Sequence, residues 1–319
     1  MTGARRRWGY GAMHVFIGGV AGSTGRLLAE GLLARGVAVT GLDDRPCYPA
    51  VPGLQFVRAA YTQPEWHGYL AGIDAAVLLT PLRWPSPRRE RARETCLVTD
   101  AQAFVDAVRG AGVPRLVVAN NLALYGLVPA DAAPLDEDGA VRGHQASAYG
   151  RARARLSDWL ELQVRPQYNG VLTHLRCAWL VGGRHTELIR HFRRLPVLIC
   201  GEEERALALV HEDDALSAIV WALEHDLPGV YHVAGGSVPF GELAALVGRV
   251  RTCVPMIWLM SRAWLGWRWR GWPTPPLWTR ALVRGPLLAT KRLEATGWSP
   301  RHSPRAALAA ALEAVVATR

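Results

Sequence analysis

The hydrophobic positions in the first 120 residues follow two alternating patterns. Short apolar runs, typical of buried strands, lie at residues 14–17, 37–42, 74–80 and 115–119. Between them, apolar side chains recur at helical spacing, as Leu28 and Leu32 do ahead of Gly36, and again over residues 101–109. Strands separated by helices of this length predict a parallel sheet with helices on both faces.

The second half of the chain continues this alternation less regularly. Helices are expected at residues 149–161, 214–224 and 304–316, and strands at residues 171–176 and 230–234. Two stretches, about 178–207 and 238–300, show no regular period, and the later one carries six tryptophans from Trp258 to Trp278. These stretches are expected to form a smaller, irregular region attached to the sheet.

A run of glycines joins the first expected strand to the first expected helix. The seven positions are Gly19, Val20, Ala21, Gly22, Ser23, Thr24 and Gly25. Glycine at every third position lets the backbone turn tightly and approach a diphosphate, which then lies at the positive end of the helix. A plain strand–turn–helix with closely packed glycines is the alternative, but the position between strand and helix favours a dinucleotide site.

The expected fold is therefore α/β: a Rossmann-type, doubly wound parallel sheet with a smaller, Trp-rich C-terminal substrate-binding region. Residues 1–12 are predicted to be a disordered tail, and residues 13–177 a dinucleotide-binding domain that residues 208–236 rejoin. The substrate-binding region is expected at residues 178–207 and 237–303. Residues 304–319 are expected to form a closing helix.

The charged residues around the glycine run leave the choice of cofactor open. Asp43 lies at the end of the second strand, 18 residues past Gly25 and followed by Asp44. Such an acid accepts hydrogen bonds from the ribose hydroxyls of NAD and repels the 2′-phosphate of NADP. Arg26 and Arg45 favour the phosphate instead. The cofactor is therefore predicted to be NADP(H) or NAD(H).

The composition excludes some catalytic mechanisms and argues against some binding partners. The chain has 319 residues and a net charge of +10, yet Lys291 is its only lysine, so catalysis by a lysine elsewhere is excluded. Arginines are scattered along the chain, which speaks against a nucleic-acid partner. Five widely spaced cysteines argue against a disulfide framework or a metal site and favour the cytoplasm. No segment has the length and hydropathy of a membrane span, and no membrane partner is expected, although an interfacial membrane helix at Trp264–Trp272 is the alternative.

Several short motifs, in order, resemble the extended short-chain dehydrogenase/reductase superfamily and its NAD-dependent epimerase/dehydratase group. The resemblance covers residues 13 to about 312. Besides the glycine run, the matching segments are residues 72–77, 117–126, 147–153, Leu175-Arg176, 210–214 and 296–301. It implies a nicotinamide cofactor, a small-molecule substrate and an enzyme of the oxidoreductase type. It also allows a homodimer.

The catalytic positions that the resemblance implies are only partly preserved. The tyrosine position matches Tyr149, but the lysine position holds Arg153 and the serine position holds Asn121. Thr80 and Pro81 replace the usual alanines after the fourth strand. Arg153 keeps a positive charge beside Tyr149 but cannot relay a proton, while Asn121 can still donate a hydrogen bond to a carbonyl oxygen.

The second unusual feature is the density of tryptophans where the family builds its substrate region. Flat, stiff aromatic side chains suit a large planar or apolar ligand, although most of them could equally serve packing. The residues predicted to contact the substrate are Tyr125, Trp179, Trp264 and Trp267.

Three functions remain open at this point. The first is an NAD(P)H-dependent ketoreductase that acts on a bulky aromatic or polyketide-like metabolite, as in antibiotic biosynthesis, with proton transfer assisted by the substrate. The second is a nucleotide-sugar epimerase or dehydratase, against which the replaced lysine and serine weigh. The third is a non-catalytic dinucleotide-binding sensor.

Overall fold

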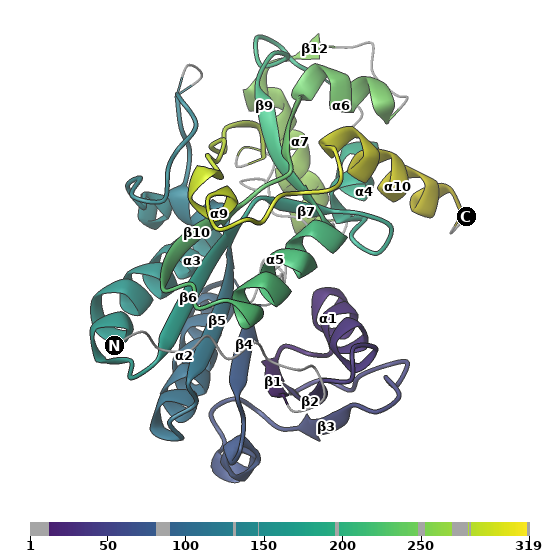
Figure 1. Ribbon diagram of the computed structural model, residues 1–319. Helices are drawn as coiled ribbons and strands as arrows, with labels where there is room; N and C mark the ends of the chain where they lie inside the picture. Colours follow the sequence, from purple (N-terminus) through teal and green to yellow (C-terminus); the bar gives the residue numbers. More distant parts are fainter. Residues whose placement is uncertain are drawn as a thin grey trace.

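A seven-stranded parallel sheet forms the centre of the molecule (Figure 1). The computed structural model describes residues 13–80, 90–129, 132–145, 147–194, 198–247, 253–269, 280 and 282–317. The strands are β1 (His14–Gly18), β2 (Ala38–Asp43), β3 (Gln55–Arg58), β4 (Ala75–Leu79), β5 (Arg115–Asn121), β6 (Val171–Cys177) and β10 (Gly229–Val233). Their order is β10-β6-β5-β4-β1-β2-β3. The order reverses between β1 and β4, so a crevice for a ligand is expected at the carboxyl ends of these strands.

Helices cover both faces of the sheet, as the hydrophobic pattern predicts. Val15 and Ile17 of β1 enter one hydrophobic core, whereas Phe16 between them enters the other. The first core lies beneath α1 (Ser23–Leu33) and α5 (Glu212–Glu224), and the second beneath α2 (Glu90–Gly110) and α3 (Ala148–Trp159). Alternate side chains are buried on opposite faces, which explains why the strands read as continuous apolar runs.

The smaller region lies beyond the carboxyl ends of the central strands (Figure 1). It contains short elements where the sequence shows no regular period: β7 (Trp179–Val181), α4 (Glu187–Arg194), β8 (Leu198–Ile199), β9 (Ala206–His211), β11 (Gly236–Pro239), α6 (Phe240–Leu246), β12 (Cys253–Val254), α7 (Met256–Trp269) and α9 (Lys291–Glu294). The closing helix is α10 (Pro304–Ala317). Strands β11, β9 and β7 form one small sheet, and β12 pairs with β8.

Short 3₁₀-helical and π-helical segments lie between these elements. The 3₁₀ turns are η2 (Pro64–Leu70), η3 (Leu122–Tyr125), η4 (Gly143–Gln145) and η6 (Arg165–Gln167), and a π-helical turn, η5 (Leu160–Val164), extends α3.

The α/β class and the parallel sheet predicted from the sequence are confirmed, with differences in detail. Strand β3 was not predicted, and α2 begins at Glu90 rather than near residue 101. Cys200 is disulfide-bonded, which the odd cysteine count and wide spacing gave no reason to expect. The predicted tail at residues 1–12 lies outside the described residues. Among the described helices, none combines the length and hydropathy needed to cross a bilayer.

Replacing Phe104 of α2 by alanine is expected to lower the free energy of unfolding by about 3–5 kcal/mol. Its side chain is fully buried, and its ring centroid lies 5.9 Å from that of Phe16 and 5.8 Å from that of Trp66. Urea unfolding of Phe104→Ala measures the loss. Tyr69→Ala, at an exposed position, is the control and should change stability by less than about 0.5 kcal/mol; similar losses in both variants would contradict this account of the core.

Candidate functional site

The loop between β1 and α1 requires glycine at two of its three motif positions. Gly19 has a φ of +90°, and a Cβ atom there would lie 2.6 Å from the carbonyl oxygen of Leu79. A Cβ atom on Gly25 would lie 2.3 Å from the carbonyl oxygen of Gly19. Both contacts are far too short for a side chain. The glycines therefore bring the loop against the end of β4 and the first turn of α1 against the loop.

The N-terminus of α1 is well suited to bind an anion. Gly22 caps the helix without a side-chain hydrogen bond, and no acidic residue lies in the first turn. The first N–H groups of an α-helix have no partner within the helix, and the helix dipole adds partial positive charge there. The turn that begins with Ser23 and Thr24 therefore provides the donors that a diphosphate needs.

A buried histidine links this turn to the smaller region. Nε2 of His185 lies 3.0 Å from Oγ of Ser23 and 2.9 Å from Oγ1 of Thr24. Nδ1 of the same ring lies 2.7 Å from Oε2 of Glu212. Because a carboxylate accepts, we assign the proton to Nδ1, which leaves Nε2 facing the two hydroxyl groups.

Glu212 holds the loop that carries this histidine. Its carboxylate also accepts hydrogen bonds from the backbone N–H groups of Arg184 and His185. Burial alone would raise the pKa of Glu212, but these donors hold that pKa below its usual value. Glu212 lies in the segment 210–214 that resembles the family, whereas nothing in the sequence marks His185, since Ser23 and Thr24 lie more than 160 positions away from it.

Asp43 is already paired within the protein. Its carboxylate accepts hydrogen bonds from the Ala21 N–H at 3.1 Å and from Nε and Nη2 of Arg45 at 3.0 and 3.1 Å. The side chain of Asp43 is 2% exposed, whereas that of Arg45 is 39% exposed. Asp44 is exposed beside them, and Arg26 pairs with Glu30 at 3.6 Å. Asp43, the acid expected to contact a ribose, thus forms an ion pair with Arg45 that has no net charge. Arg45 is the more accessible partner of this pair.

The predicted catalytic residues converge where β4 and β5 end. Oδ1 of Asn121 caps the turn η3 by accepting from the Ala123 N–H, and Nδ2 of Asn120 donates to the carbonyl oxygen of Arg153. Nη2 of Arg153 donates to the carbonyl oxygen of Thr80 at 3.2 Å. These bonds fix α3 against the carboxyl edge of the sheet.

Tyr149 lies against Arg153 on the same helix. The guanidinium carbon of Arg153 is 4.8 Å from the centroid of the Tyr149 ring. Burial raises the pKa of Tyr149 above its usual value, and the charge and hydrogen bond of Arg153 only partly oppose this effect. The neutral hydroxyl is therefore the resting form of Tyr149, and the raised pKa makes it a weaker acid than an ordinary tyrosine.

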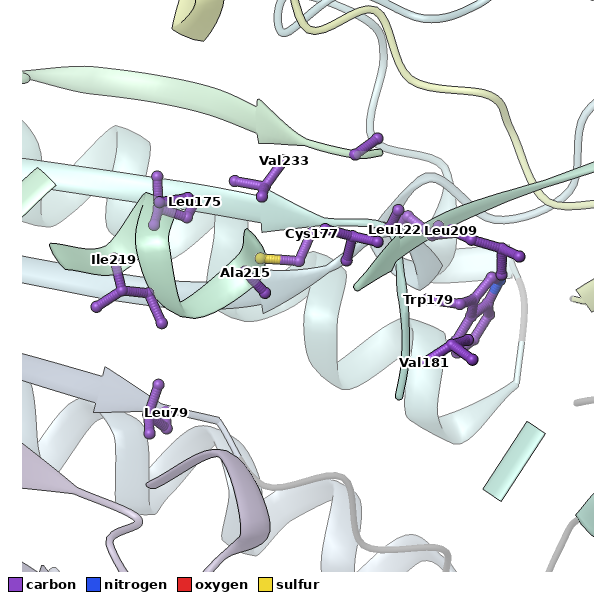
Figure 2. Packing of buried hydrophobic residues seen from close by; sticks show 14 of the residues in the cluster. Leu79, Leu122, Leu175, Cys177, Trp179, Val181, Leu209, Ala215, Ile219 and Val233 are labelled. Carbon is purple, nitrogen blue, oxygen red and sulfur yellow. The ribbon is translucent and has the colours of Figure 1, made fainter. Parts of the chain in front are cut away.

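A cavity opens at this edge of the sheet. Its lining residues come from the ends of β4, β5 and β6, from α1, α3 and α5, and from β7; they are Thr24, Leu79, Thr80, Ala119, Asn120, Asn121, Arg153, Cys177, Leu180, Ala215 and Ile219. Figure 2 shows Ala215 and Ile219 of α5 near Cys177 of β6, with Leu79 of β4 across from them. Six of the eleven lining residues are apolar, and the polar ones are Thr24, Thr80, Asn120, Asn121 and Arg153. Tyr149 is buried against Arg153 and does not line the cavity, and Pro81 lies outside the described residues.

The residues predicted to contact the substrate lie elsewhere. Tyr125 is fully buried, and its hydroxyl group bonds to Nη1 of Arg176 at 2.7 Å and to Nε2 of His232 at 2.5 Å. Trp179 packs in the core beside Leu209 and Val181 (Figure 2). These placements correct the expectation for both residues, because buried groups with internal partners are not open to a ligand.

The two remaining tryptophans are on α7. Trp264 is half exposed and Trp267 is partly buried, and neither lines the cavity.

Comparisons with known proteins agree with this geometry. The sequence matches the family described as the NAD dependent epimerase/dehydratase family over residues 15–234, more than half of the chain. No curated protein matches the sequence. Solved structures show the same fold at low sequence identity.

Three of these structures illustrate the likeness. MoeE5 in complex with UDP-glucuronic acid and NAD has a TM-score of 0.74 and 21% identity, over 96% of this chain and 100% of that chain. UDP-glucose 4-epimerase with UDP-glucose from Thermotoga maritima has a TM-score of 0.74 and 19% identity, over 96% and 99%. TunA, an NAD dependent NDP-hexosamine 5,6-dehydratase involved in tunicamycin biosynthesis, has a TM-score of 0.70 and 18% identity, over 96% and 98%.

The glycine loop, the parallel sheet with its reversal of strand order and the match over residues 15–234 lead to one conclusion: this chain belongs to the NAD dependent epimerase/dehydratase family.

Proposed function

We propose that the protein is an NAD(P)H-dependent ketoreductase that reduces a carbonyl group on a bulky aromatic or polyketide-like substrate. The observation that carries this proposal is the cavity at the ends of β4, β5 and β6, whose lining combines six apolar residues with Asn121 and Arg153, while Tyr149 lies against Arg153. A protonated hydroxyl group is the form that a reduction needs, because the carbonyl oxygen must receive a proton.

The residues at the carboxyl edge of the sheet fit a nicotinamide dinucleotide. The first turn of α1 would hold the diphosphate, and the Asp43–Arg45 pair would meet the adenosine ribose. Arg153 would donate to the nicotinamide ribose, and the apolar walls around Leu79 would surround the ring. The reduced cofactor, when bound, supplies the hydride that adds to the carbonyl carbon.

The protein residues handle the proton and the developing charge. In this proposal the carbonyl oxygen receives its one proton either from the hydroxyl group of Tyr149 or from an acidic group of the substrate, which Tyr149 then reprotonates. Asn121 donates a hydrogen bond from Nδ2 to the same oxygen, since its Oδ1 is engaged in the cap of η3. The fixed charge of Arg153 stabilises the resulting phenolate without exchanging a proton itself.

The second candidate is a nucleotide-sugar epimerase or dehydratase. The family match and the likeness to MoeE5, the Thermotoga epimerase and TunA favour it directly. Such a reaction, however, needs an enzyme group that exchanges a proton with a sugar hydroxyl, and Arg153, which occupies the lysine position, cannot exchange one.

One set of measurements separates the candidates. Purified protein is titrated with NADH and NADPH, and then receives either aromatic ketones or UDP-sugars. Oxidation of the cofactor with the ketones alone supports the ketoreductase, whereas turnover of a UDP-sugar overturns it. Tight cofactor binding without turnover on either panel would point to a non-catalytic sensor.

Tyr149→Phe is expected to lower kcat by about 10²- to 10⁴-fold, the usual cost of losing a general acid. Because the pKa of Tyr149 is raised, the reduction rate of the wild type should stay level through neutral pH. It should fall only above the ordinary tyrosine range near pH 10. Steady-state kinetics between pH 6 and pH 11 measure both effects; full activity in Tyr149→Phe would assign the proton to the substrate.

The Asp43–Arg45 pair is expected to determine the choice between NADPH and NADH. Arg45→Ala leaves the Asp43 carboxylate without its cation and should shift the ratio of the two dissociation constants about 10- to 100-fold toward NADH. Asp43→Asn should shift it toward NADPH. Isothermal titration with both cofactors measures the ratio, and Arg35→Ala, at an exposed position just past the end of α1, serves as the control.

His185→Ala is expected to weaken cofactor binding about 5- to 30-fold, since Ser23, Thr24 and Glu212 each lose a partner at the diphosphate-binding turn. His185→Asn, which retains one donor and one acceptor, should recover part of the loss. Equal affinity in wild type and His185→Ala, measured by cofactor fluorescence, would show that the turn does not depend on this histidine.

A further inference from the structure

Helix α7 leaves most of its large apolar side chains exposed. Leu259, Ala263 and Gly266 are its buried positions. The exposed ones include five large apolar side chains: Ile257 (75% exposed), Trp258 (51%), Trp264 (49%), Leu265 (54%) and Trp269 (72%). A helix that only packs on a core has the reverse arrangement.

This exposure is concentrated on one element. In the part of the chain that the structure describes, five of the ten exposed large hydrophobic side chains lie on α7. The other five are spread over the rest of the molecule, from Tyr48 to Val316. Single exposed apolar residues are ordinary, but a contiguous group marks an interaction surface. We call these five side chains, with Arg262 and Arg268 between them, the α7 face.

The positive charge of the α7 face indicates which class of partner it can bind. The guanidinium carbon of Arg262 lies 6.0 Å from the ring centroid of Trp258, and that of Arg268 lies 5.0 Å from the ring centroid of Trp269. Residues 256–269 contain no acid, and the whole chain carries a net charge of +10. Two copies joined through this face would bring like charges together, so the surface fits an anionic partner instead.

We propose that the α7 face binds the surface of an anionic lipid bilayer, with the helix lying in the interfacial plane. Tryptophan side chains favour the boundary between lipid headgroups and acyl chains, and arginines beside them pair with acidic headgroups. Helix α7 has 14 residues, so it lies on the membrane and does not span it. From the sequence we expected no membrane partner. Only the structure shows which side chains of α7 are exposed.

Co-flotation of the full-length protein with lipid vesicles tests the proposal without cofactor or substrate, so its outcome is independent of the proposed function. Vesicles of phosphatidylcholine alone are compared with vesicles that also contain phosphatidylglycerol. The protein should float with the anionic vesicles, and added salt should weaken this binding.

Two sets of variants probe the two components of the face. Trp258→Ser with Trp269→Ser removes apolar contact and should lower the partition coefficient at least tenfold. Arg262→Gln with Arg268→Gln removes charge and should lower it about 10- to 30-fold on anionic vesicles only. Tyr48→Ser and Arg35→Gln, at exposed positions elsewhere, are the matched controls and should leave binding unchanged.

Three results would overturn the proposal: no binding to anionic vesicles, binding that the α7 variants leave unchanged, or equal binding to both kinds of vesicle. Sedimentation velocity without lipid addresses the other occupant of this face. A dimer that Trp258→Ser with Trp269→Ser dissociates would assign the α7 face to a second copy of the chain. Near-ultraviolet circular dichroism establishes that each variant is folded.

Discussion

The buried guanidinium of Arg153 governs the arrangement of the candidate site. A full positive charge held away from water is costly unless polar groups surround it. Here the carbonyl oxygen of Thr80 and the ring of Tyr149 lie against it, and Asn120 fixes the backbone of the same residue. The strand ends, helix α3 and the cavity are thus held together around one cation that, unlike lysine, stays charged at any working pH.

Because the cation is Arg153, the acid–base chemistry of this site differs from that of a site with lysine in the same position. An ammonium group in this position could change its charge during a catalytic cycle, whereas a guanidinium group cannot. The pKa of Tyr149 then depends mainly on burial. The raised pKa makes loss of the tyrosine proton harder, and Arg153 opposes this effect only through its fixed charge.

The sequence predicted those parts of the fold that rest on local periodicity. The β1–glycine loop–α1 unit and the buried strands follow from patterns within short windows, whereas Asn121, Arg153 and Thr80 were assigned to the site through the resemblance to the family. The short strands β7, β8 and β12 have two or three residues each and show no period of their own. They form because distant segments pair with them, so a local pattern cannot reveal them.

Side-chain roles that depend on partners far away in the chain also could not be predicted from the sequence. Tyr125 and Trp179 are aromatic residues in suggestive positions, yet burial by Arg176, His232 and the core decides what they do. His185 and the pairing of Asp43 with Arg45 became apparent only in three dimensions. Composition showed the density of tryptophan near residue 260, but only the accessible surface showed which of these rings face outward.

The close contact between the glycine loop and β4 has a consequence for how the protein is made. The backbone at Gly19 takes its shape against the carbonyl oxygen of Leu79, which lies 60 positions later in the chain. Contacts between such distant positions form slowly, because the intervening loop must first close. A nascent chain that ends before β4 therefore lacks one wall of the dinucleotide loop, and the ability to bind a dinucleotide arises only once the central strands have assembled during synthesis.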